Sequence, residues 1–323
     1  MAIIRTLNGD ISANQLGVTY SHDHIYCIPP YWAERQDDDL LLDDPQASER
    51  ELSDFRQAGG NAIYDATAPD YGRQAAAVAA MAQRQQLHII ATAGFNKGFL
   101  WSSRRPGTAQ TFAEWIERSD VDELVEHVCR EVTEGIEGTA HRAGVVKCGT
   151  GYNAISPLEY KTMEVIVRAQ QRTGAPMHSH TEMGTMGLEQ ARIFKKWGLD
   201  LSRLCFAHMD RNPDPWLHRQ IANTGAFLSF DGISRIKYHP EHIRTQAILA
   251  LCQRGYQKQI VIGGDFARKS MSAHYGKGGL GLKFILSDWR PRFMEEAREA
   301  GFDGEALLHD FFVENPARYL AFA

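Results

Sequence analysis

The fold is decided by a unit that is clearest in Gly144-Val-Val-Lys-Cys-Gly149 and Pro176-Met-His-Ser-His-Thr181. Each stretch is a short apolar run of the kind that forms a buried strand. A segment of helix length separates the two runs and closes with Arg172-Thr-Gly174, a typical helix-stop signal. Strand, helix and strand in this order predict two parallel neighbours in one sheet.

Runs of this kind recur along the chain, and helix-length segments separate them. They occupy residues 17–24, 61–67, 88–94, 144–149, 176–181, 204–208, 226–231 and 259–265. Eight alternating units over this length predict an α/β protein with a closed (β/α)8 barrel, the TIM barrel. An open doubly wound sheet is the alternative, but no glycine-rich dinucleotide motif follows the first strand.

Length and composition are those of an ordinary globular protein. The chain has 323 residues, of which 43% are hydrophobic and 23% charged. No linker, low-complexity tract or repeat is visible, so we expect residues 1–323 to form a single barrel domain. The formal net charge of −5 argues against nucleic acid as the main partner. The segment from Tyr31 to Asp54 is acidic, and we expect it to be a solvated insertion after the first strand.

Cysteine usage and apolar runs bear on the compartment. The five cysteines form no CxxC pair, and their odd number leaves one unpaired under any disulfide scheme, which favours a reducing compartment. The N-terminus Met-Ala-Ile-Ile-Arg lacks the apolar region of a secretory signal. The longest apolar run, Ala75 to Ala82, is far shorter than the roughly 20 residues of a membrane helix. We therefore expect a soluble, cytoplasmic protein without a membrane partner.

Unusual polar residues fall at the carboxyl ends of the predicted strands, where barrels of this type carry their active sites. The first run ends in His22-Asp-His24, and side chains two residues apart share a face of a strand. Later runs add further candidates: Lys147, His178, His180, His208 and Asp265. A single histidine near a strand end is most often structural. The convergence of four of these histidines with an aspartate and a buried lysine instead predicts a metal site of the zinc type.

Lys147 is the most informative member of this group. An ammonium inside a barrel carries a large desolvation cost, so it must lose its proton or find a partner. Reaction of its amine with CO2 would give a carbamate, an anionic ligand able to bridge two cations. Pairing with a nearby carboxylate is the alternative, and composition leaves both open.

Five motifs are similar to those of a known family. They are Ser21-His-Asp-His24, Val146-Lys-Cys-Gly149, His180-Thr-Glu-Met-Gly-Thr-Met-Gly187, Phe206-Ala-His-Met-Asp210 and Gly263-Gly-Asp265. Together and in this order they resemble the phosphotriesterase-like branch of the amidohydrolase superfamily. That branch includes phosphotriesterases, lactonases and relatives that act on phosphorylated sugar lactones. The resemblance extends from residue 3 to near the end of the chain.

The resemblance implies a binuclear metal centre, with zinc as the expected metal. Six side chains would supply its ligands: His22, His24, Lys147, His180, His208 and Asp265. The first two histidines and the aspartate would hold the more buried ion, and the other two histidines the more exposed one. Carbamylated Lys147 and a hydroxide would bridge the ions, although some relatives have Glu at this position. His178 is not part of the family motif, and we expect it to lie behind the ligands or in the core.

The resemblance also implies a mechanism. Paired divalent cations lower the pKa of bound water enough to supply hydroxide near neutral pH, and the hydroxide attacks a carbonyl or phosphoryl group. Asp265 would take the proton and deliver it to the leaving oxygen as a general acid. Asp210, two residues after His208, is a candidate proton relay, with a surface position as the alternative. Relatives are often dimers, so a homodimer is possible.

Two predicted loops are basic although the chain is not. Arg235 and Lys237 follow the seventh strand, and Arg268 follows the eighth, where barrels commonly bind phosphate. We therefore expect a small anionic substrate. The pattern resembles the phosphorylated-sugar-lactone members of the family, in which a Lys and an Arg at these places bind phosphate. Those members often have a Tyr three residues after the Arg, where this chain has Met271; Tyr275 is the candidate substitute. The expected function is a lactonase that opens a phosphorylated sugar lactone.

Two other functions remain open at this point. The first is a phosphotriesterase or a hydrolase of neutral lactones or carboxylic esters, with an apolar pocket lined by Phe95, Phe99 and Trp101. The second is a metal-stabilised binding protein without turnover. The mixed ligand set argues against the second, because structural zinc sites are usually closed and four-coordinate.

Overall fold

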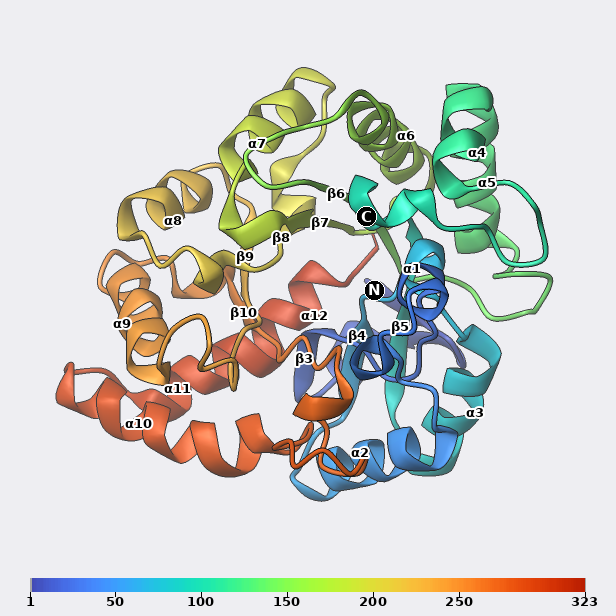
Figure 1. The fold of residues 1–323 in the computed structure, drawn as a ribbon. Helices are drawn as coiled ribbons and strands as arrows, with labels where there is room; N and C mark the ends of the chain where they lie inside the picture. Colours follow the sequence, from blue (N-terminus) through green and yellow to red (C-terminus); the bar gives the residue numbers. More distant parts are fainter. Residues whose placement is uncertain (1, 323) are drawn as a thin grey trace.

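Eight parallel strands form a barrel surrounded by helices (Figure 1). The computed structural model describes residues 2–322. The strands follow one another round the barrel in sequence order, each hydrogen-bonded to the next. Their bounds are β3 Thr19–Asp23, β4 Ala62–Asp65, β5 His88–Gly94, β6 Val145–Thr150, β7 Met177–Thr181, β8 Leu204–Phe206, β9 Phe227–Phe230 and β10 Ile260–Ile262. The predicted (β/α)8 fold is confirmed, and each predicted run coincides with one strand.

Helices fill the connections and form the outer layer of the barrel. The longer ones are α2 Pro45–Gln57, α3 Ala75–Gln85, α5 Val121–Thr133, α6 Pro157–Thr173, α7 Gly187–Lys196, α8 Pro215–Ala222, α9 Glu241–Cys252 and α10 Arg290–Glu299. The shorter ones are α1 Pro30–Glu34, α4 Phe112–Arg118, α11 Gly304–His309 and α12 Asn315–Tyr319. The predicted stop signal after α6 is confirmed, because Gly174 follows it with a φ of 70°. This left-handed conformation is the usual end of a helix at glycine.

The first and last strands of the barrel meet closely. The backbone N–H of Asp265, just beyond β10, donates a hydrogen bond to the carbonyl oxygen of His22 in β3 at 3.1 Å. A Cβ on Gly263 would come within 2.5 Å of the same oxygen. Only glycine permits this approach, so Gly263 lets the ring close at the point where two predicted ligands lie.

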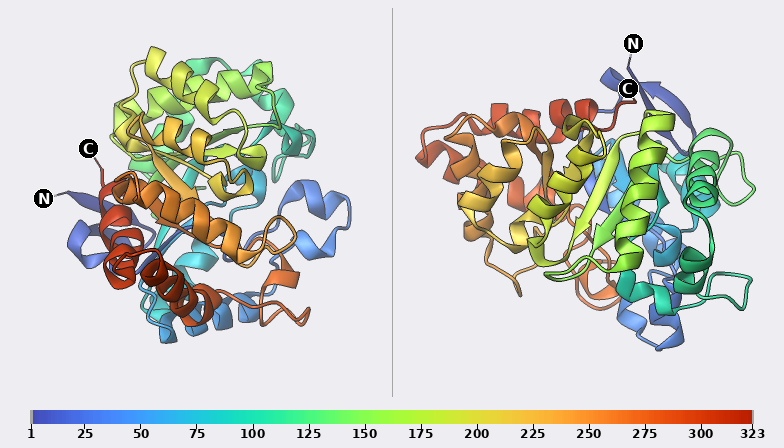
Figure 2. Two further views of the ribbon diagram at one scale, coloured as in Figure 1. Left: turned by 90° about the vertical axis from the view of Figure 1, so that its left-hand side faces the viewer. Right: turned by 90° about the horizontal axis from the view of Figure 1, so that it is seen from above.

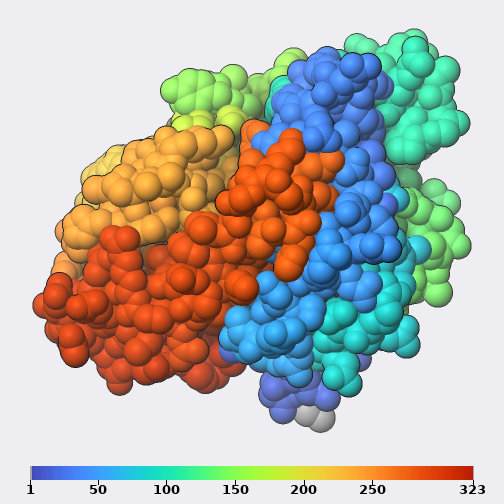
Figure 3. Space-filling view, turned by 60° about the horizontal axis from the view of Figure 1, so that its bottom comes forward, coloured from blue at the N-terminus to red at the C-terminus, as the bar shows by residue number. Residues whose placement is uncertain are grey.

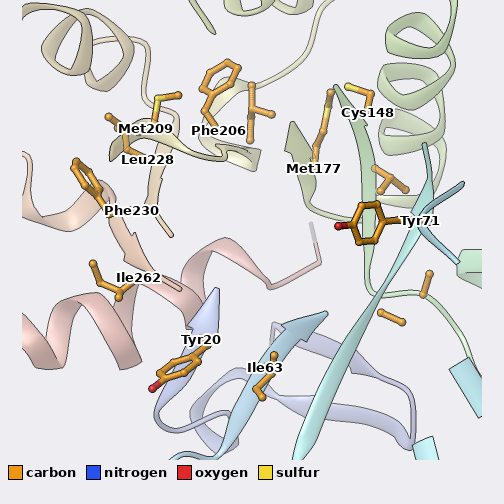
Figure 4. Packing of buried hydrophobic residues seen from close by; sticks show 14 of the residues in the cluster. Tyr20, Ile63, Tyr71, Cys148, Met177, Phe206, Met209, Leu228, Phe230 and Ile262 are labelled. Carbon is orange, nitrogen blue, oxygen red and sulfur yellow. The ribbon is translucent and has the colours of Figure 1, made fainter. Parts of the chain in front are cut away.

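Alternating side chains of the strands build two hydrophobic layers. The outer layer lies between strands and helices and includes residues labelled in Figure 4: Tyr20, Ile63, Met177, Phe206, Leu228 and Ile262. The inner layer fills the lower part of the barrel and includes Tyr64, Ile90, Val145, Phe227 and Tyr319. Tyr319 comes from α12 near the end of the chain, so this short helix contributes to the floor of the barrel.

An irregularity in β3 sets the direction of the two histidines on this strand. The register of β3 against β4 shifts between Tyr20 and Asp23. Tyr20 therefore belongs to the outer layer, whereas His22, two residues later, lies among the groups inside the barrel. A bulge of this kind re-aims the residues that follow it, which brings His22 and His24 to the inside.

The two ends of the barrel differ in content. Both chain termini lie at one end, and the segment around α1 lies at the other (Figure 2). A hairpin that the sequence analysis did not predict, β1 Ile3–Thr6 and β2 Gly9–Ser12, lies near the terminal end. No helix among residues 2–322 is both long and apolar enough to cross a membrane. All five cysteines are buried, and none of them forms a disulfide.

The acidic segment after β3 packs against the loop after β10 (Figure 3). Lys269 and Lys277 place their Nζ atoms 2.5 Å and 2.7 Å from the two carboxylate oxygens of Asp38. Arg268 lies 3.2 Å from Asp39. Much of the segment is exposed, as expected for a solvated insertion, but its aspartates also pair with cations of the basic loop, which the expectation did not include. The hydrogen bond from Lys269 is the main cause that lowers the pKa of Asp38 to about 2.

Candidate active site

A cavity of about 450 Å³ opens at the carboxyl ends of the strands. It is lined by all six residues that the sequence analysis named as metal ligands: His22, His24, Lys147, His180, His208 and Asp265. Each of these side chains is buried. The rim includes aromatic groups, among them Trp32, Phe99 and Tyr238.

Asp265 faces the two histidines of the first strand. Its Oδ1 lies 3.4 Å from Nε2 of His24 and 3.7 Å from Nε2 of His22. The three side chains present their ligand atoms close enough together to hold one metal ion. Asp265 has a φ of 45°, an uncommon left-handed conformation for a residue with a side chain. Such strain is typical of functional positions.

His180 and His208 meet on the other side of the cavity, where Nδ1 of His180 lies 2.9 Å from Nε2 of His208. His208 also has left-handed backbone, with a φ of 63°. Asp231 holds it twice: one oxygen lies 2.6 Å from Nδ1 of His208, and the other accepts a hydrogen bond from its backbone N–H at 3.0 Å. His208, Asp231 and His22 form a second group able to hold a metal ion.

The protonation of the histidines fits a metal centre. Burial lowers the pKa of His22 and of His208 well below the ordinary value. Burial and the charge of Lys97 lower the pKa of His180 to about 3. These imidazoles are therefore neutral near pH 7, and the neutral form is the one that binds metals. Nδ1 of His24 contacts Thr67 Oγ1 at 2.8 Å, which leaves its other nitrogen for a ligand.

Lys147 is buried, and its amine is hydrogen-bonded to the backbone. Its Nζ donates a hydrogen bond to the carbonyl oxygen of Ala66 at 2.7 Å. Among residues 2–322, no carboxylate lies within ion-pair distance of it, so the alternative of a paired lysine is not found. Burial lowers the pKa of Lys147 to about 8. A substantial fraction of its amine is therefore neutral near physiological pH and able to react with CO2.

Two arginines contact the catalytic candidate Asp265. Arg235 lies 2.7 Å from its Oδ2, and Arg211 contacts the same oxygen. Burial alone would raise the pKa of Asp265, but the charge of Arg235, the nearby imidazole of His24 and the charge of Arg211 hold it well below its ordinary value. Arg235 is predicted from the sequence only as a loop cation, and Arg211 is not predicted. The position of Arg211 shortly after a strand-end histidine is the signal that could have found it.

A second ion pair, also missed, flanks His180. Lys97 contacts Glu182, and its Nζ lies 3.3 Å from Nε2 of His180. Glu182 also lies 2.9 Å from the same nitrogen. Both residues occupy the loops directly after β5 and β7, so a search of every loop residue near a strand end would have included them.

The residues predicted to bind phosphate lie in different surroundings. Arg268 lines the cavity while it pairs with Asp39. Lys237 is exposed and outside the cavity lining, with its Nζ 5.0 Å from the centre of the Tyr238 ring. Tyr275 is also outside the lining; its Oη lies 2.7 Å from Ser48 Oγ and donates to the carbonyl oxygen of Asp44 at 3.0 Å. The structure brings one of the three to the cavity.

Asp210 is fully buried, so the alternative of a surface position is wrong. It accepts a hydrogen bond from Nε of Arg244 at 2.8 Å and one from the backbone N–H of Asp231 at 3.2 Å. Asp210 thus positions the backbone of Asp231, whose carboxylate holds His208.

The predicted apolar pocket is only partly formed. Phe99 lines the cavity, whereas Phe95 and Trp101 are buried in the outer hydrophobic layer.

Comparison with known proteins agrees with this architecture. A lactonase from Listeria monocytogenes has a similar structure, with a TM-score of 0.98 and 52% sequence identity over the whole of both chains. A phospho-furanose lactonase from Mycoplasmopsis synoviae is 31% identical over 98% of this chain and 91% of its own. The structure of the phosphotriesterase homology protein from Escherichia coli, complexed with phosphate in its active site, matches with a TM-score of 0.85 and 26% identity, covering 95% of this chain and 99% of that one.

The sequence model of the phosphotriesterase family matches residues 2–320 of this chain. This match covers nearly the whole barrel and every residue that lines the cavity. The chain therefore belongs to the phosphotriesterase family and is a hydrolase of the lactonase or phosphotriesterase-like type.

Proposed function

We propose that the protein is a binuclear metal-dependent lactonase that opens a phosphorylated sugar lactone. The observation that carries this proposal is the meeting of four histidines, the Asp265 carboxylate and the amine of Lys147 at one cavity. Two divalent cations held there, with zinc as the expected metal, would supply a nucleophilic water of lowered pKa and polarise a carbonyl group. A carbamate on Lys147 would add the anionic bridging ligand that two cations require.

Asp265 is the proposed proton carrier. It would accept a proton as water adds to the lactone carbonyl and return that proton to the ring oxygen as the carbon–oxygen bond breaks. Arg211 and Arg235 lower its pKa, so a proton held by Asp265 is given up readily to the more basic leaving oxygen. The same arginines fix the carboxylate in one orientation.

The substrate is proposed to be anionic because cations surround the cavity. Four of them line it, each beside a carboxylate that it pairs with: Arg211, Arg235, Lys97 and Arg268. The guanidinium of Arg268 would pair with phosphate oxygens in two parallel hydrogen bonds. Lys237 and Tyr275, on the adjoining loops, are the further candidates for phosphate recognition. The relative named phospho-furanose lactonase supports this substrate class.

Hydrolysis of neutral lactones or phosphotriesters is the second candidate. Phe99 is 47% exposed at the rim, beside Trp32, and offers an apolar surface to an uncharged substrate. A solved structure from the molecular engineering of organophosphate hydrolysis activity on a weak promiscuous lactonase template is similar, with a TM-score of 0.82 and 27% identity over 99% of this chain and 100% of that one.

A lactone panel tests the proposal. Sugar 1,4- and 1,5-lactones with and without a terminal phosphate are offered to the protein. Ring opening is monitored through the protons that it releases. Metal content is measured on the same preparation. Two ions per chain and preferential turnover of phosphorylated lactones are expected. Equal turnover of neutral lactones would favour the second candidate, and full activity after complete metal removal would refute both.

A further inference from the structure

His178 lies below the cavity in a chain of hydrogen bonds that the proposed mechanism does not use. Its Nε2 is 2.9 Å from Nδ1 of His22, and its Nδ1 is 2.8 Å from Oη of Tyr319. Exposure of the three side chains is 1% for His22 and 0% for the other two. These hydrogen bonds therefore connect a candidate metal ligand, through the barrel interior, to the helix α12.

Protons can occupy this chain in two registers. In the first, His22 carries its proton on Nδ1 and donates it to His178, and His178 donates from Nδ1 to Tyr319. In the second, Tyr319 donates to His178, and His178 donates from Nε2 to His22. In that register the proton of His22 sits on Nε2, the nitrogen that faces Asp265. A protonated nitrogen has no lone pair, so only the first register allows His22 to bind a metal through Nε2.

No carboxylate of the described residues replaces His178 as the acceptor of the Nδ1 proton of His22. The nearest carboxylate oxygen to Nδ1 of His22 is Oδ2 of Asp231, at 3.5 Å, beyond a good hydrogen bond. That oxygen already accepts the backbone N–H of His208. The proton on Nδ1 of His22 therefore depends on His178, and the proton on Nδ1 of His178 depends on Tyr319.

We propose that His178 and Tyr319 are positioning residues that hold His22 in the tautomer whose Nε2 is free to bind a metal ion. The inference rests on the proposed metal centre and concerns residues outside it. A ligand histidine usually donates its second N–H to a carboxylate, a carbonyl or water. Here a second histidine and a tyrosine serve instead, and they connect the metal centre to α12.

Tyr64 provides a matched control. It is fully buried in the same inner layer, and its ring centre lies 4.9 Å from that of His178. Its hydroxyl, however, accepts a hydrogen bond from Thr92 at 3.0 Å and is not part of the chain. Thr92 keeps a second acceptor, the carbonyl oxygen of Asp65. Tyr64→Phe and Tyr319→Phe thus each remove one buried hydroxyl oxygen, and only Tyr319→Phe breaks the chain of hydrogen bonds to His22.

The experiment measures zinc affinity by competition with a chelator for the full chain and its variants. Tyr319→Phe and His178→Leu are expected to weaken the affinity of the tighter site by about 10- to 100-fold. The zinc affinity of Tyr64→Phe is expected to stay within about 3-fold of wild type. This variant also loses one buried hydrogen bond, but not one that His178 makes. His178→Gln is expected to recover part of the loss, because its amide can accept from His22 and donate to Tyr319.

Nitrogen-15 spectra of histidine in the zinc-loaded wild type provide a second readout that a merely structural role would not move. A proton on Nδ1 of His22 and of His178 is the expected pattern. A proton on Nε2 of His22 would overturn the inference, even if Tyr319→Phe fails to fold. Equal zinc affinity of Tyr319→Phe and Tyr64→Phe would overturn it while leaving the metal centre intact. A wild type that binds no zinc would instead overturn the metal centre, and the inference with it.

Discussion

Arg235 and Asp265 are joined by an ion pair of 2.7 Å, on the side of the carboxylate away from His24. The carboxylate therefore serves two sets of partners: histidines through Oδ1 and guanidinium groups through Oδ2. This division assigns Asp265 both a ligand role and a proton-carrying role in the proposed mechanism. It also connects the loop after β9, which carries Arg235, to the reacting groups.

Replacement of Asp265 tests the proton-carrying role. Asp265→Asn is expected to lower kcat on the best lactone by at least about 100-fold, the usual lower range for loss of acid–base catalysis. The circular dichroism spectrum of the folded barrel should be retained. Asp10→Asn, which alters a surface ion pair with Arg5, is the control and should keep the wild-type rate. A near wild-type rate for Asp265→Asn would rule out the assigned role.

Phosphate recognition is tested on the loops after β9 and β10. Arg268→Ala is expected to raise KM for phosphorylated lactones by about 10- to 100-fold, the range for a lost hydrogen bond to a charged group, and Lys237→Ala to raise it less. KM for neutral lactones should change little. Lys277→Ala is the matched control, because Lys277 belongs to the same loop but pairs with Asp38 outside the cavity. Equal changes for both substrates would argue against a phosphate site.

The state of Lys147 is tested by reconstitution with zinc after metal removal. Bicarbonate is expected to accelerate recovery of activity, because carbamate formation consumes CO2. Burial sets the pKa of Lys147 at about 8, so the neutral amine, and with it the rate of recovery, should rise with pH through that value. Lys147→Met should bind fewer ions and show no response to bicarbonate, whereas Lys147→Glu should retain a carboxylate ligand. Recovery of the wild type that is independent of bicarbonate would contradict a carbamate.

Asp70 gives a pH dependence of stability. It accepts hydrogen bonds from the Asn96 N–H and from Trp101, but burial dominates and raises its pKa from 3.8 to about 6. The folded state therefore binds more protons than the unfolded state between these values, and stability falls as pH rises through them. The fall amounts to at most about 3 kcal/mol for a shift of about two pKa units.

The measurement compares urea unfolding of the metal-free wild type and Asp70→Asn. The difference between their unfolding free energies should change between about pH 4 and pH 6 and level off above, because the amide does not titrate. A difference that is constant across this interval would show that Asp70 titrates normally.

A buried ion pair supports the wall of the barrel. Arg73 binds both oxygens of Glu131, at 2.5 Å and 2.9 Å, and also Glu137 at 2.9 Å. Glu131→Gln should destabilise the protein by about 3–5 kcal/mol, because it removes the buried partner of a buried guanidinium. Glu137→Gln alters the same arginine, but its carboxylate is 51% exposed, so the cost should stay below about 1 kcal/mol. Equal midpoints in urea unfolding would contradict this ranking.

The barrel could be predicted because its strands are apolar runs separated by capped helices. The sequence around Gly174, for example, marks the end of α6 directly. The direction of His22 was harder, because it depends on the irregularity between Tyr20 and Asp23, which has no local signature. Periodicity alone would have placed Tyr20 and His22 on one face.

The site was only partly predictable for a related reason. His22, His24 and His180 stand on or next to strands, where neighbours are set by register. Arg211 and Lys97 belong to loops, and their contacts follow from backbone turns such as the left-handed His208. Asp38 shows the same limit: charge alone predicted its exposure to solvent, but not its ion pair with Lys269 of the loop after β10.

The closure between His22 and Asp265 also bears on the order in which the molecule can be assembled. His22 precedes Asp265 and Tyr319 in the sequence by most of the barrel, so it leaves the ribosome well before either of them. The hydrogen bond that closes the barrel and the approach of the His22 ring to the Asp265 carboxylate both join these distant segments. A nascent chain that has not yet reached Asp265 therefore has neither the closing hydrogen bond nor the complete set of proposed ligands. In the proposed metal centre, capture of the ions would accordingly follow the meeting of these two segments.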